Sequence, residues 1–427
     1  MQLNRRLSAP SDNTNVPITE RTMTMTDRVI LHCDCNGFFA SVECVYRPEL
    51  KDVPMAVCGD PESRHGIILA KNELAKGFGV KTAETIWQAK QKCPNLTLVP
   101  ARHDAYREFS RRVNEIYCRY TSQVEPFGID ESWLDVTASR LLFGDGPTIA
   151  DRLREDVRRE TGLTISVGVS FNKIFAKLGS DYKKPDATTV ISRENFRSIV
   201  WPLPVEDLLF VGKSAADTLH RMGIYTIGEL AEWDIGILQT KLGKLGPQLS
   251  AYARGEENSP VAEFGTETAA KSVGHGVTYP KDLRGREQIL PAVLELCDQV
   301  AARVRRNGDE ATTITVAIKD PYLHTISRQK TMSRSSDLAR EFFRTAMELF
   351  DKHWDYRLPI RAITVTASGF GFGTMGEQLS LFGGEEHQID QQKVRRLEGT
   401  MDSIRKKYGG EAVSFARTIK KEEKKEE

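Results

Sequence analysis

The sequence Ile30-Leu-His-Cys-Asp-Cys-Asn-Gly-Phe-Phe-Ala-Ser41 carries an apolar run through a single carboxylate into a Gly-containing turn. The short apolar run from Val29 to Cys33 predicts a buried strand, and the residues from about Phe38 to Tyr46 predict the helix that follows it. Asp34 then lies at the C-terminal end of the strand, where ligand and metal sites collect when strands lead into helices. We therefore expect an α/β first domain with a functional site at this strand end.

A second acidic motif, Phe127-Gly-Ile-Asp-Glu-Ser-Trp-Leu-Asp-Val-Thr137, supplies the adjacent carboxylates Asp130 and Glu131. These two residues and Asp34 form an anionic pocket if the fold brings them together. Hard divalent cations such as Mg²⁺ prefer oxygen ligands, and two such ions about 3.5–4 Å apart serve phosphoryl transfer by activating one oxygen and stabilising another. The divided set of carboxylates therefore points to nucleotide chemistry.

The adjacent acidic pair poses a geometric problem, because successive side chains of a strand point to opposite faces. Asp130 and Glu131 can reach one metal centre only at a bend. Phe127-Gly128 is the candidate for that bend, since Gly adopts the dihedral angles of tight turns and bulges. Asp135, further along the same strand, is expected to be structural.

The composition indicates a globular protein of several domains. Its 427 residues predict two to four domains, and 40% of them are apolar and 28% charged. The apolar runs are too short to span a bilayer, so no membrane segment is expected. The net charge of +1 gives no sign of a polyanionic partner. Seven cysteines without CxxC spacing argue against a disulfide framework or a zinc site and favour a reducing cytoplasm.

Patterns along the rest of the chain predict its organisation. Residues 1–27 have no apolar periodicity and are expected to be a disordered leader, whether or not residues 1–24 belong to the native protein. The strands and helices up to about residue 170 follow the β-α-β-β-α-β order of a ferredoxin-type sheet. Two Gly-rich turns follow, Phe210–Ser214 and Leu242–Pro247, which present backbone N–H groups to phosphates or serve only as structural turns.

After a linker at 255–268, the sequence predicts a further α/β domain. The expected elements are a helix at 286–306, a strand at 312–319, a helix at 338–354 and a strand at 360–368. An amphipathic helix is expected at about 388–407, before a charged tail. For that helix, intramolecular packing and partner binding are both open.

The chain resembles a Y-family DNA polymerase of the bacterial DNA polymerase IV group across about residues 28–382. Five motifs in the order of the family carry the resemblance: Asp34-Cys-Asn-Gly-Phe-Phe-Ala40, Ile129-Asp-Glu-Ser-Trp-Leu-Asp-Val136, Ser166-Val-Gly-Val-Ser170, Lys177-Leu-Gly-Ser-Asp-Tyr-Lys-Lys-Pro185 and Val211-Gly-Lys213. The resemblance implies an α+β right-hand polymerase. Its expected parts are a ferredoxin-like palm at 28–200 with small fingers inserted at about 46–100, a helical thumb at 201–254, the linker at 255–268, a little finger at 269–372, a clamp-binding segment at 373–387, and a helix with a charged tail at 388–427.

The resemblance also implies the reaction, which is low-fidelity translesion synthesis of DNA from dNTPs. On this reading Asp34, Asp130 and Glu131 are the catalytic residues and hold two Mg²⁺ ions, for which Mn²⁺ can substitute. The backbone carbonyl of Cys35 is expected to be a further ligand. One ion would lower the pKa of the primer 3′-hydroxyl, and the other would neutralise the triphosphate as pyrophosphate leaves.

The family's nucleotide-binding roles fall on residues around the same turn. Phe39 aligns with the steric gate that excludes a ribose 2′-hydroxyl, and Phe38 is expected to pack beside it. Asn36 and Gly37 are expected to offer backbone N–H groups to the triphosphate. Lys184, which precedes Pro185, matches the lysine that contacts the triphosphate.

The chain departs from the family in its fingers and thumb. Glu73 and Lys76 stand where many members have Tyr and Arg, and Lys is a point charge where Arg grips phosphate with a planar fork. Lys71 is therefore expected to contribute to nucleotide binding with Lys76. In the thumb, Phe210 stands where the family usually has Gly, which predicts an altered loop shape. The DNA-binding residues expected there are Gly212, Lys213 and Ser214, and Ser132-Trp133 replaces the commoner Ala-Tyr after the acidic pair.

The segment Gln378-Leu-Ser-Leu-Phe382 resembles the peptide with which bacterial polymerases bind the β subunit of the sliding clamp. Gln378, Leu379, Leu381 and Phe382 are the expected contacts. The implied partners are primer-template DNA, dNTPs and the clamp, for a monomer in the nucleoid of the cytoplasm. Two alternatives are a non-catalytic scaffold that binds clamp and DNA, and a catalytic chain similar to that of polymerase V that needs accessory proteins.

Overall fold

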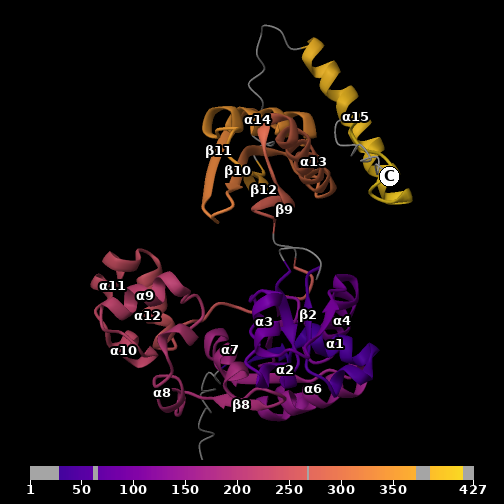
Figure 1. Cartoon of the computed structure of the whole chain (residues 1–427). Coiled ribbons are helices and arrows are strands. Elements are labelled where there is room, and N and C mark those ends of the chain that lie inside the picture. The colour runs from indigo at the N-terminus through magenta and orange to yellow at the C-terminus, as the bar shows by residue number, and fades with distance from the viewer. Residues whose placement is uncertain (1–27, 61–65, 267–268, 372–384, 417–427) are drawn as a thin grey trace, which may run out of the picture. The chain divides into compact units, whose positions relative to one another are not determined.

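The protein is described by a computed structural model that covers residues 28–60, 66–266, 269–371 and 385–416, with side chains from residue 392 in the last segment. The chain divides into two compact units (Figure 1). One contains the described residues up to 266 apart from 60–66, and the other contains mainly the residues from 267 onward. No helix in the described part of the chain is both long and apolar enough to cross a membrane.

A five-stranded sheet forms the centre of the first unit, in the order β5-β6-β1-β7-β8. Its strands are β1 (Ile30–Cys35), β5 (Val124–Pro126), β6 (Glu131–Asp135), β7 (Ile165–Ser170) and β8 (Thr188–Ile191). The middle strand β1 runs antiparallel to both β6 and β7, so Asp34 lies opposite Glu131 on one side and opposite Ser166 on the other. This register joins the two acidic motifs, which are far apart in the sequence.

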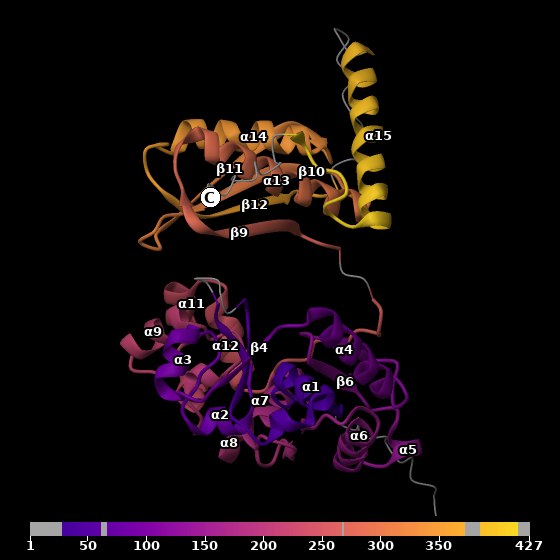
Figure 2. The ribbon, with the colours of Figure 1, turned by 45° about the vertical axis from the view of Figure 1, so that its right-hand side comes forward.

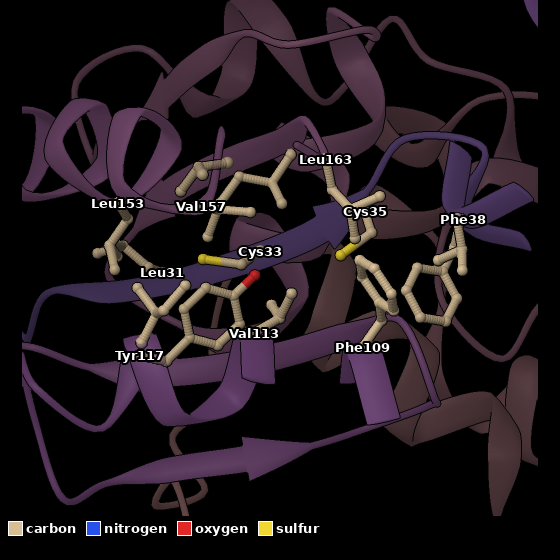
Figure 3. Close-up of a cluster of buried hydrophobic side chains, with 14 of the residues drawn as sticks. Leu31, Cys33, Cys35, Phe38, Phe109, Val113, Tyr117, Leu153, Val157 and Leu163 are labelled. Atoms are coloured by element: carbon tan, nitrogen blue, oxygen red, sulfur yellow. The ribbon is translucent and has the colours of Figure 1, made fainter. Parts of the chain in front are cut away.

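One face of β1 belongs to the hydrophobic core of the sheet. Leu31, Cys33 and Cys35 point into a buried cluster (Figure 3). The cluster is completed by side chains of helices α4 (His103–Tyr117) and α6 (Gly146–Thr161). Both cysteines are free thiols, and burial raises their pKa values well above the ordinary range. Their side chains therefore pack rather than react.

The opposite face of β1 meets helix α7 (Lys173–Tyr182). Alternation along the strand sends Ile30, His32 and Asp34 to this side. The Nδ1 atom of His32 lies 2.8 Å from the hydroxyl of Ser180 on α7. The approach is close because β7 has glycine at residue 168: a Cβ atom there would lie 2.5 Å from the backbone nitrogen of Ser180. This glycine allows α7 to bring its side chains to the acidic strand end.

A smaller sheet and several helices complete the first unit. Three strands in the order β3-β2-β4 form that sheet. The elements around it are α1 (Phe38–Tyr46), the 3₁₀ helix η1 (Pro48–Lys51), β2 (Met55–Cys58), β3 (Ile68–Lys71), α2 (Glu73–Gly77), α3 (Ile86–Lys92) and β4 (Thr97–Pro100). A short helix, α5 (Arg140–Phe143), precedes α6.

The segment expected to be the thumb is helical, as predicted. Its elements are α8 (Phe196–Ile199), the 3₁₀ helix η2 (Val205–Asp207), α9 (Lys213–Arg221), α10 (Ile227–Glu232), α11 (Ile235–Leu242) and α12 (Leu245–Ala253). Their apolar side chains share one buried cluster with Ile174, Phe175 and Leu178 of α7. Helix α7 thus packs against the large sheet and against these helices.

The second unit contains a four-stranded antiparallel sheet in the order β11-β10-β12-β9. Its elements are β9 (Ser272–Leu283), α13 (Gly285–Arg306), β10 (Ala311–Lys319), β11 (Thr325–Ser336), α14 (Ala339–His353) and β12 (Ile360–Ser368). Figure 2 shows α13 and α14 side by side on one face of this sheet. The sequence predicted both helices and the two inner strands, but not the edge strands β9 and β11.

The C-terminal helix α15 (Glu385–Tyr408) is docked on the second unit by ion pairs. Glu398 is only 3% exposed, pairs with Arg305 of α13 and accepts a 3.0 Å hydrogen bond from the backbone N–H of Ala339. Arg405 pairs with Asp298 at 2.7 Å, and Arg395 pairs with Asp337 at 2.8 Å. Intramolecular packing is therefore one role of this helix.

Candidate active site

The three carboxylates expected to bind metal lie together at the C-terminal end of β1. Asp34 is the penultimate residue of β1 and pairs in register with Glu131, the first residue of β6. Asp130 lies before β6, in a bend closed by a 2.9 Å hydrogen bond from the backbone N–H of Phe127 to the carbonyl of Glu131. A 3.0 Å bond from the N–H of Cys35 to the carbonyl of Asp130 ties this bend to β1. The predicted bend next to Gly128 is confirmed.

Two lysines balance part of this negative charge. The Nζ atom of Lys177 pairs with both Asp34, at 3.3 Å, and Glu131. The Nζ atom of Lys184 lies 2.8 Å from the same oxygen of Asp34. The sequence predicted a role for Lys184 but not for Lys177, although both belong to one motif. The position of Lys177 on helix α7 brings its ammonium to Asp34 and Glu131, and the motif alone does not indicate this.

The surroundings of Asp130 and Glu131 shift their pKa values in opposite directions. Burial, together with the charges of Asp34 and Glu131, raises the pKa of Asp130 to about 6. Burial alone would also raise the pKa of Glu131, but hydrogen bonds from His32 and Lys177 outweigh it and lower the pKa to about 2. Asp130 is thus the carboxylate of this site whose charge is least compensated.

The donor set fits hard divalent cations. All three side chains present carboxylate oxygens, the ligands that Mg²⁺ prefers, and within the described residues Asp130 forms no ion pair with a lysine or arginine. No three acidic, His or Cys side chains converge on one point in that part of the chain. The reason is that Asp34 and Glu131 are turned toward Lys177, Lys184 and the ring of His32, whose Nε2 is 3.3 Å from Glu131.

The two phenylalanines of the first motif have different surroundings. Phe38 is buried in the core, whereas Phe39 is only partly buried and stacks on Tyr106, with ring centroids 4.1 Å apart and planes at 13°. The hydroxyl of Tyr106 donates a 2.8 Å hydrogen bond to the buried carboxylate of Glu43, which Arg102 grips through two further bonds of 2.7 and 3.0 Å. The ring of Phe39 therefore packs against a tyrosine whose hydroxyl is held in place by Glu43. This packing was not predicted from the sequence.

A cleft of about 340 Å³ adjoins the turn after β1. It is lined by residues of that turn and of the smaller sheet, including Asn36, Gly37, Lys51, Lys71, Glu73 and Pro185. Lys71 lines the cleft, where burial lowers its pKa, but Lys76 is exposed and lies 3.1 Å from Glu73. Of the two lysines expected to contribute to nucleotide binding, Lys71 lines the cleft and Lys76 does not. Lys51 is an additional cation that the sequence did not reveal.

The expected role of the Asn36 backbone is wrong. Its N–H donates a 2.9 Å hydrogen bond to the carbonyl of Thr164 and is therefore not free for a phosphate. The strand pairing of β1 with β7 continues for one residue beyond β1 and uses this donor. Gly37 lies directly after it in the left-handed region, at φ 52°.

The two Gly-rich turns of the thumb segment meet around one hollow. Gly212, Lys213 and Ser214 line it at the start of α9, with Lys241 and Leu242 at the end of α11. Phe210 is 52% exposed and has a φ of 72°, a conformation that Gly adopts more readily than Phe. The residues expected to bind the clamp, Gln378, Leu379, Leu381 and Phe382, lie outside the described residues.

Comparison with known proteins identifies the family of the chain. The sequence matches the profile of the impB/mucB/samB family over residues 33–181 and that of the family's C-terminal domain over residues 270–381. It is 46% identical over 382 residues to the DNA polymerase IV of Acetivibrio thermocellus, covering 90% of this chain and 95% of that protein. The DNA polymerase IV of Moorella thermoacetica is 38% identical over 92% of this chain and 97% of its own length.

A solved structure gives the same result for the fold. A Y-family DNA polymerase chimera of Dbh and Dpo4 superposes with a TM-score of 0.71 at 26% identity, covering 80% of this chain and 98% of the chimera. The predicted α/β class and right-hand polymerase architecture are thereby confirmed. The chain belongs to the impB/mucB/samB family, in the DNA polymerase IV group of Y-family polymerases.

Proposed function

We propose that this protein is a DNA-directed DNA polymerase that extends a primer on template DNA with dNTPs, at low fidelity and past damaged template bases. The observation that carries the proposal is that Asp34, Asp130 and Glu131 lie at one strand end, where their side chains are neighbours without converging on a single point. Lys184 lies beside Asp34, Phe39 is in helix α1 directly after that strand end, and the chain belongs to the DNA polymerase IV group. A deoxynucleoside triphosphate would use all three features: the acidic centre for metal ions, the aromatic ring for the sugar and the lysine for the triphosphate.

The acidic centre would hold two Mg²⁺ ions, or Mn²⁺ in their place. Asp34, Asp130 and Glu131 offer carboxylate oxygens, and the carbonyl of Cys35 is the proposed fourth ligand. When bound, such ions activate the primer 3′-hydroxyl and neutralise charge on the leaving pyrophosphate. The high pKa of Asp130 supports this assignment, because a carboxylate whose charge is poorly compensated gains most from a cation.

The residues around the acidic centre would select and orient the nucleotide. Phe39 would exclude a ribose 2′-hydroxyl, because stacking on Tyr106 leaves its ring little room to retreat. Lys184 would bind the triphosphate as a point charge, with Lys71 contributing from the cleft. Gly37 would let the chain pass close to the phosphates.

The thumb segment would bind the DNA backbone. Gly212, Lys213 and Ser214 lie where α9 begins, so their backbone N–H groups and the ammonium of Lys213 suit phosphate oxygens. Such contacts carry no sequence information and weaken steeply with salt. Sequence-independent binding of primer-template DNA is therefore part of the proposal.

The proposal includes binding of the sliding clamp through Gln378, Leu379, Leu381 and Phe382, and action as a monomer at the nucleoid. Its support is the resemblance of this peptide to the clamp-binding peptide and its place in the sequence, after β12 and before α15. A non-catalytic scaffold would not need three clustered carboxylates, and this argues against that alternative. Dependence on accessory proteins, as in polymerase V, is decided by the experiment below.

The test is primer extension by the purified chain alone, with Mg²⁺ and all four dNTPs, on an undamaged template and on one with a bulky lesion. Template-dependent products on both substrates are expected. Extension that stops at every lesion would contradict the translesion assignment. Extension that requires added proteins would favour the alternative similar to polymerase V.

A further inference from the structure

We propose that the side chain of Asn36 positions Lys184, by holding the short segment that carries this lysine against the acidic strand end. The segment runs from Lys183 to Ala187, between α7 and β8. The inference rests on the proposed function, because it assigns Asn36 a part in binding the incoming triphosphate through Lys184.

The amide of Asn36 is used on both sides. Its Oδ1 atom accepts a 2.8 Å hydrogen bond from the backbone N–H of Asp186 and a 3.1 Å bond from the hydroxyl of Thr164. Its Nδ2 atom donates a 2.9 Å bond to the hydroxyl of Ser166. The orientation of the amide follows from the first contact, because an N–H group needs an acceptor. One planar group therefore joins the end of β1 to β7 and to the Lys184 segment.

Asp186 is the point at which this segment is held. It has a φ of 51°, in the left-handed region that few residues with side chains adopt. The guanidinium of Arg154 donates a 2.6 Å bond to its carbonyl oxygen and 3.1 Å bonds to its carboxylate, and Arg158 also pairs with that carboxylate. The arginines hold Asp186 by its oxygens, and Asn36 holds it by its nitrogen.

Lys184 is two residues before this anchor. Its Nζ atom lies 2.8 Å from Asp34 and 2.8 Å from Asp181. Asp34, in turn, is two residues before Asn36. The hydrogen bond from Asp186 to Asn36 therefore links the segment that carries Lys184 to the strand end that carries Asp34. This link limits how far the ammonium of Lys184 can move from the acidic centre. A side chain without an acceptor at residue 36 would leave the N–H of Asp186 unpaired and the segment free to shift.

The primary test is Asn36→Ala, assayed by single-nucleotide primer extension with varied dNTP concentration. We expect KM for the dNTP to rise about tenfold and kcat to change less than about twofold, because Asn36 acts on phosphate binding and not on the acidic centre. A matched control is Asn195→Ala. Its amide also holds a loop, by accepting from the N–H of Ser192 at 2.8 Å and donating to Val190, but it takes no part in the proposed site.

A double-mutant cycle with Lys184→Ala separates positioning from general destabilisation. If Asn36 acts through Lys184, then Asn36→Ala changes KM by less than about twofold once Lys184 is absent. A purely structural role would lower the amount of active enzyme, and hence kcat, without moving KM. An unchanged KM in Asn36→Ala, or a tenfold effect that persists without Lys184, would overturn the inference.

Thermal unfolding checks that each variant is folded. If Asn36→Ala does not fold, Arg154→Ala loosens the same segment from its other side and is expected to raise KM in the same way. An unchanged KM in that variant overturns the inference instead. The activity of the parent protein separates the proposed function from the role of Asn36. A parent protein that cannot extend a primer would contradict the proposed function. The role of Asn36 is contradicted only by the KM values of the variants.

Discussion

Substitution of Gly168 by Ala should disrupt the packing that builds the active site. Gly168 is in β7, directly beneath α7. A Cβ atom at this residue would lie inside contact distance of the carbonyl oxygen of Ala176, 2.5 Å from the nitrogen of Ser180 and 2.8 Å from the carbonyl carbon of Gly179. All three atoms belong to the backbone of α7, so no side chain can turn away to make room.

The size of the effect follows from the displacement that is needed. Ordinary contact begins at 3.4 Å, so α7 must move outward by at least about 1 Å to clear the nitrogen of Ser180, and further to clear the carbonyl oxygen of Ala176. Overpacked sites of this kind lose about 1–3 kcal/mol, and backbone on both sides places Gly168→Ala near 3 kcal/mol. For a unit of this size that corresponds to a fall in Tm of roughly 6–12 °C. The same movement would break the 2.8 Å contact between Ser180 and His32, and it would carry Lys177 away from Glu131.

The assay is thermal unfolding of the full chain, measured by calorimetry. Primer extension is measured as well, at a temperature below the unfolding transition. Gly77→Ala is the matched control, because Gly77 has an ordinary φ and a Cβ atom added there would have no neighbouring atom within 4 Å. We expect the control to unfold within about 2 °C of the parent. A Gly168→Ala variant with the Tm and the extension rate of the parent would show that α7 tolerates a side chain at this residue.

Phe39→Ala should raise the ratio of kcat/KM for a ribonucleotide to that for the matching dNTP by about tenfold or more, because it removes the ring stacked on Tyr106; an unchanged ratio would exclude a gating role. Lys71→Ala should raise KM for dNTP about three- to tenfold with little effect on kcat, and a KM equal to the parent's would show that Lys71 does not compensate for the missing Arg. Arg395→Ala should lower the free energy of unfolding of the second unit by about 0.5–1 kcal/mol at neutral pH, a value that allows for solvent screening of this half-exposed pair. Burial alone would raise the pKa of Glu310, but hydrogen bonds from Ser335 and Arg395 lower it, so this stabilisation is present above the ordinary value of 4.5 and is lost as the pH falls through the folded-state pKa. Denaturant titrations of parent and variant at neutral pH and below about pH 4 would show the difference shrinking, and a difference that grows with acidity would contradict it.

The parts of the fold that the sequence predicted are those with a strong local pattern. Helix α1 and the strand β12 have the predicted bounds, because each is a mostly apolar run with turn residues on both sides. The strands β9 and β11 were missed because they are the edges of their sheet, where no side chain of β9 and only Ser336 of β11 is buried. Strands of this kind are polar, and β9 also contains Pro280, so neither has the apolar alternation that marks a strand in sequence.

The candidate site, like the fold, was predicted only where a local motif indicates it. The motifs indicated Asp34, Asp130 and Glu131, and the bend that brings the last two together was predicted from Gly128. The contacts of Lys177 with Asp34 and of the Asn36 side chain with Asp186 could not be predicted, because each joins residues more than 140 positions apart. Such contacts depend on how α7 and the segment after it pack on the sheet. The expectation for the Asn36 backbone failed for the same reason, since its N–H pairs with Thr164 on a neighbouring strand.

The acidic centre is the core of the account, and removing its charge while keeping its shape tests the account most directly. The measurement is the rate of primer extension with Mg²⁺ by the parent and by the double variant Asp130→Asn/Glu131→Gln. Asp135→Asn serves as a control, because Asp135 is a carboxylate of the same strand that pairs with Arg28 and Thr137. We predict a loss of at least about a thousandfold in the double variant and a rate close to the parent's in the control. Equal extension by parent and double variant would contradict it.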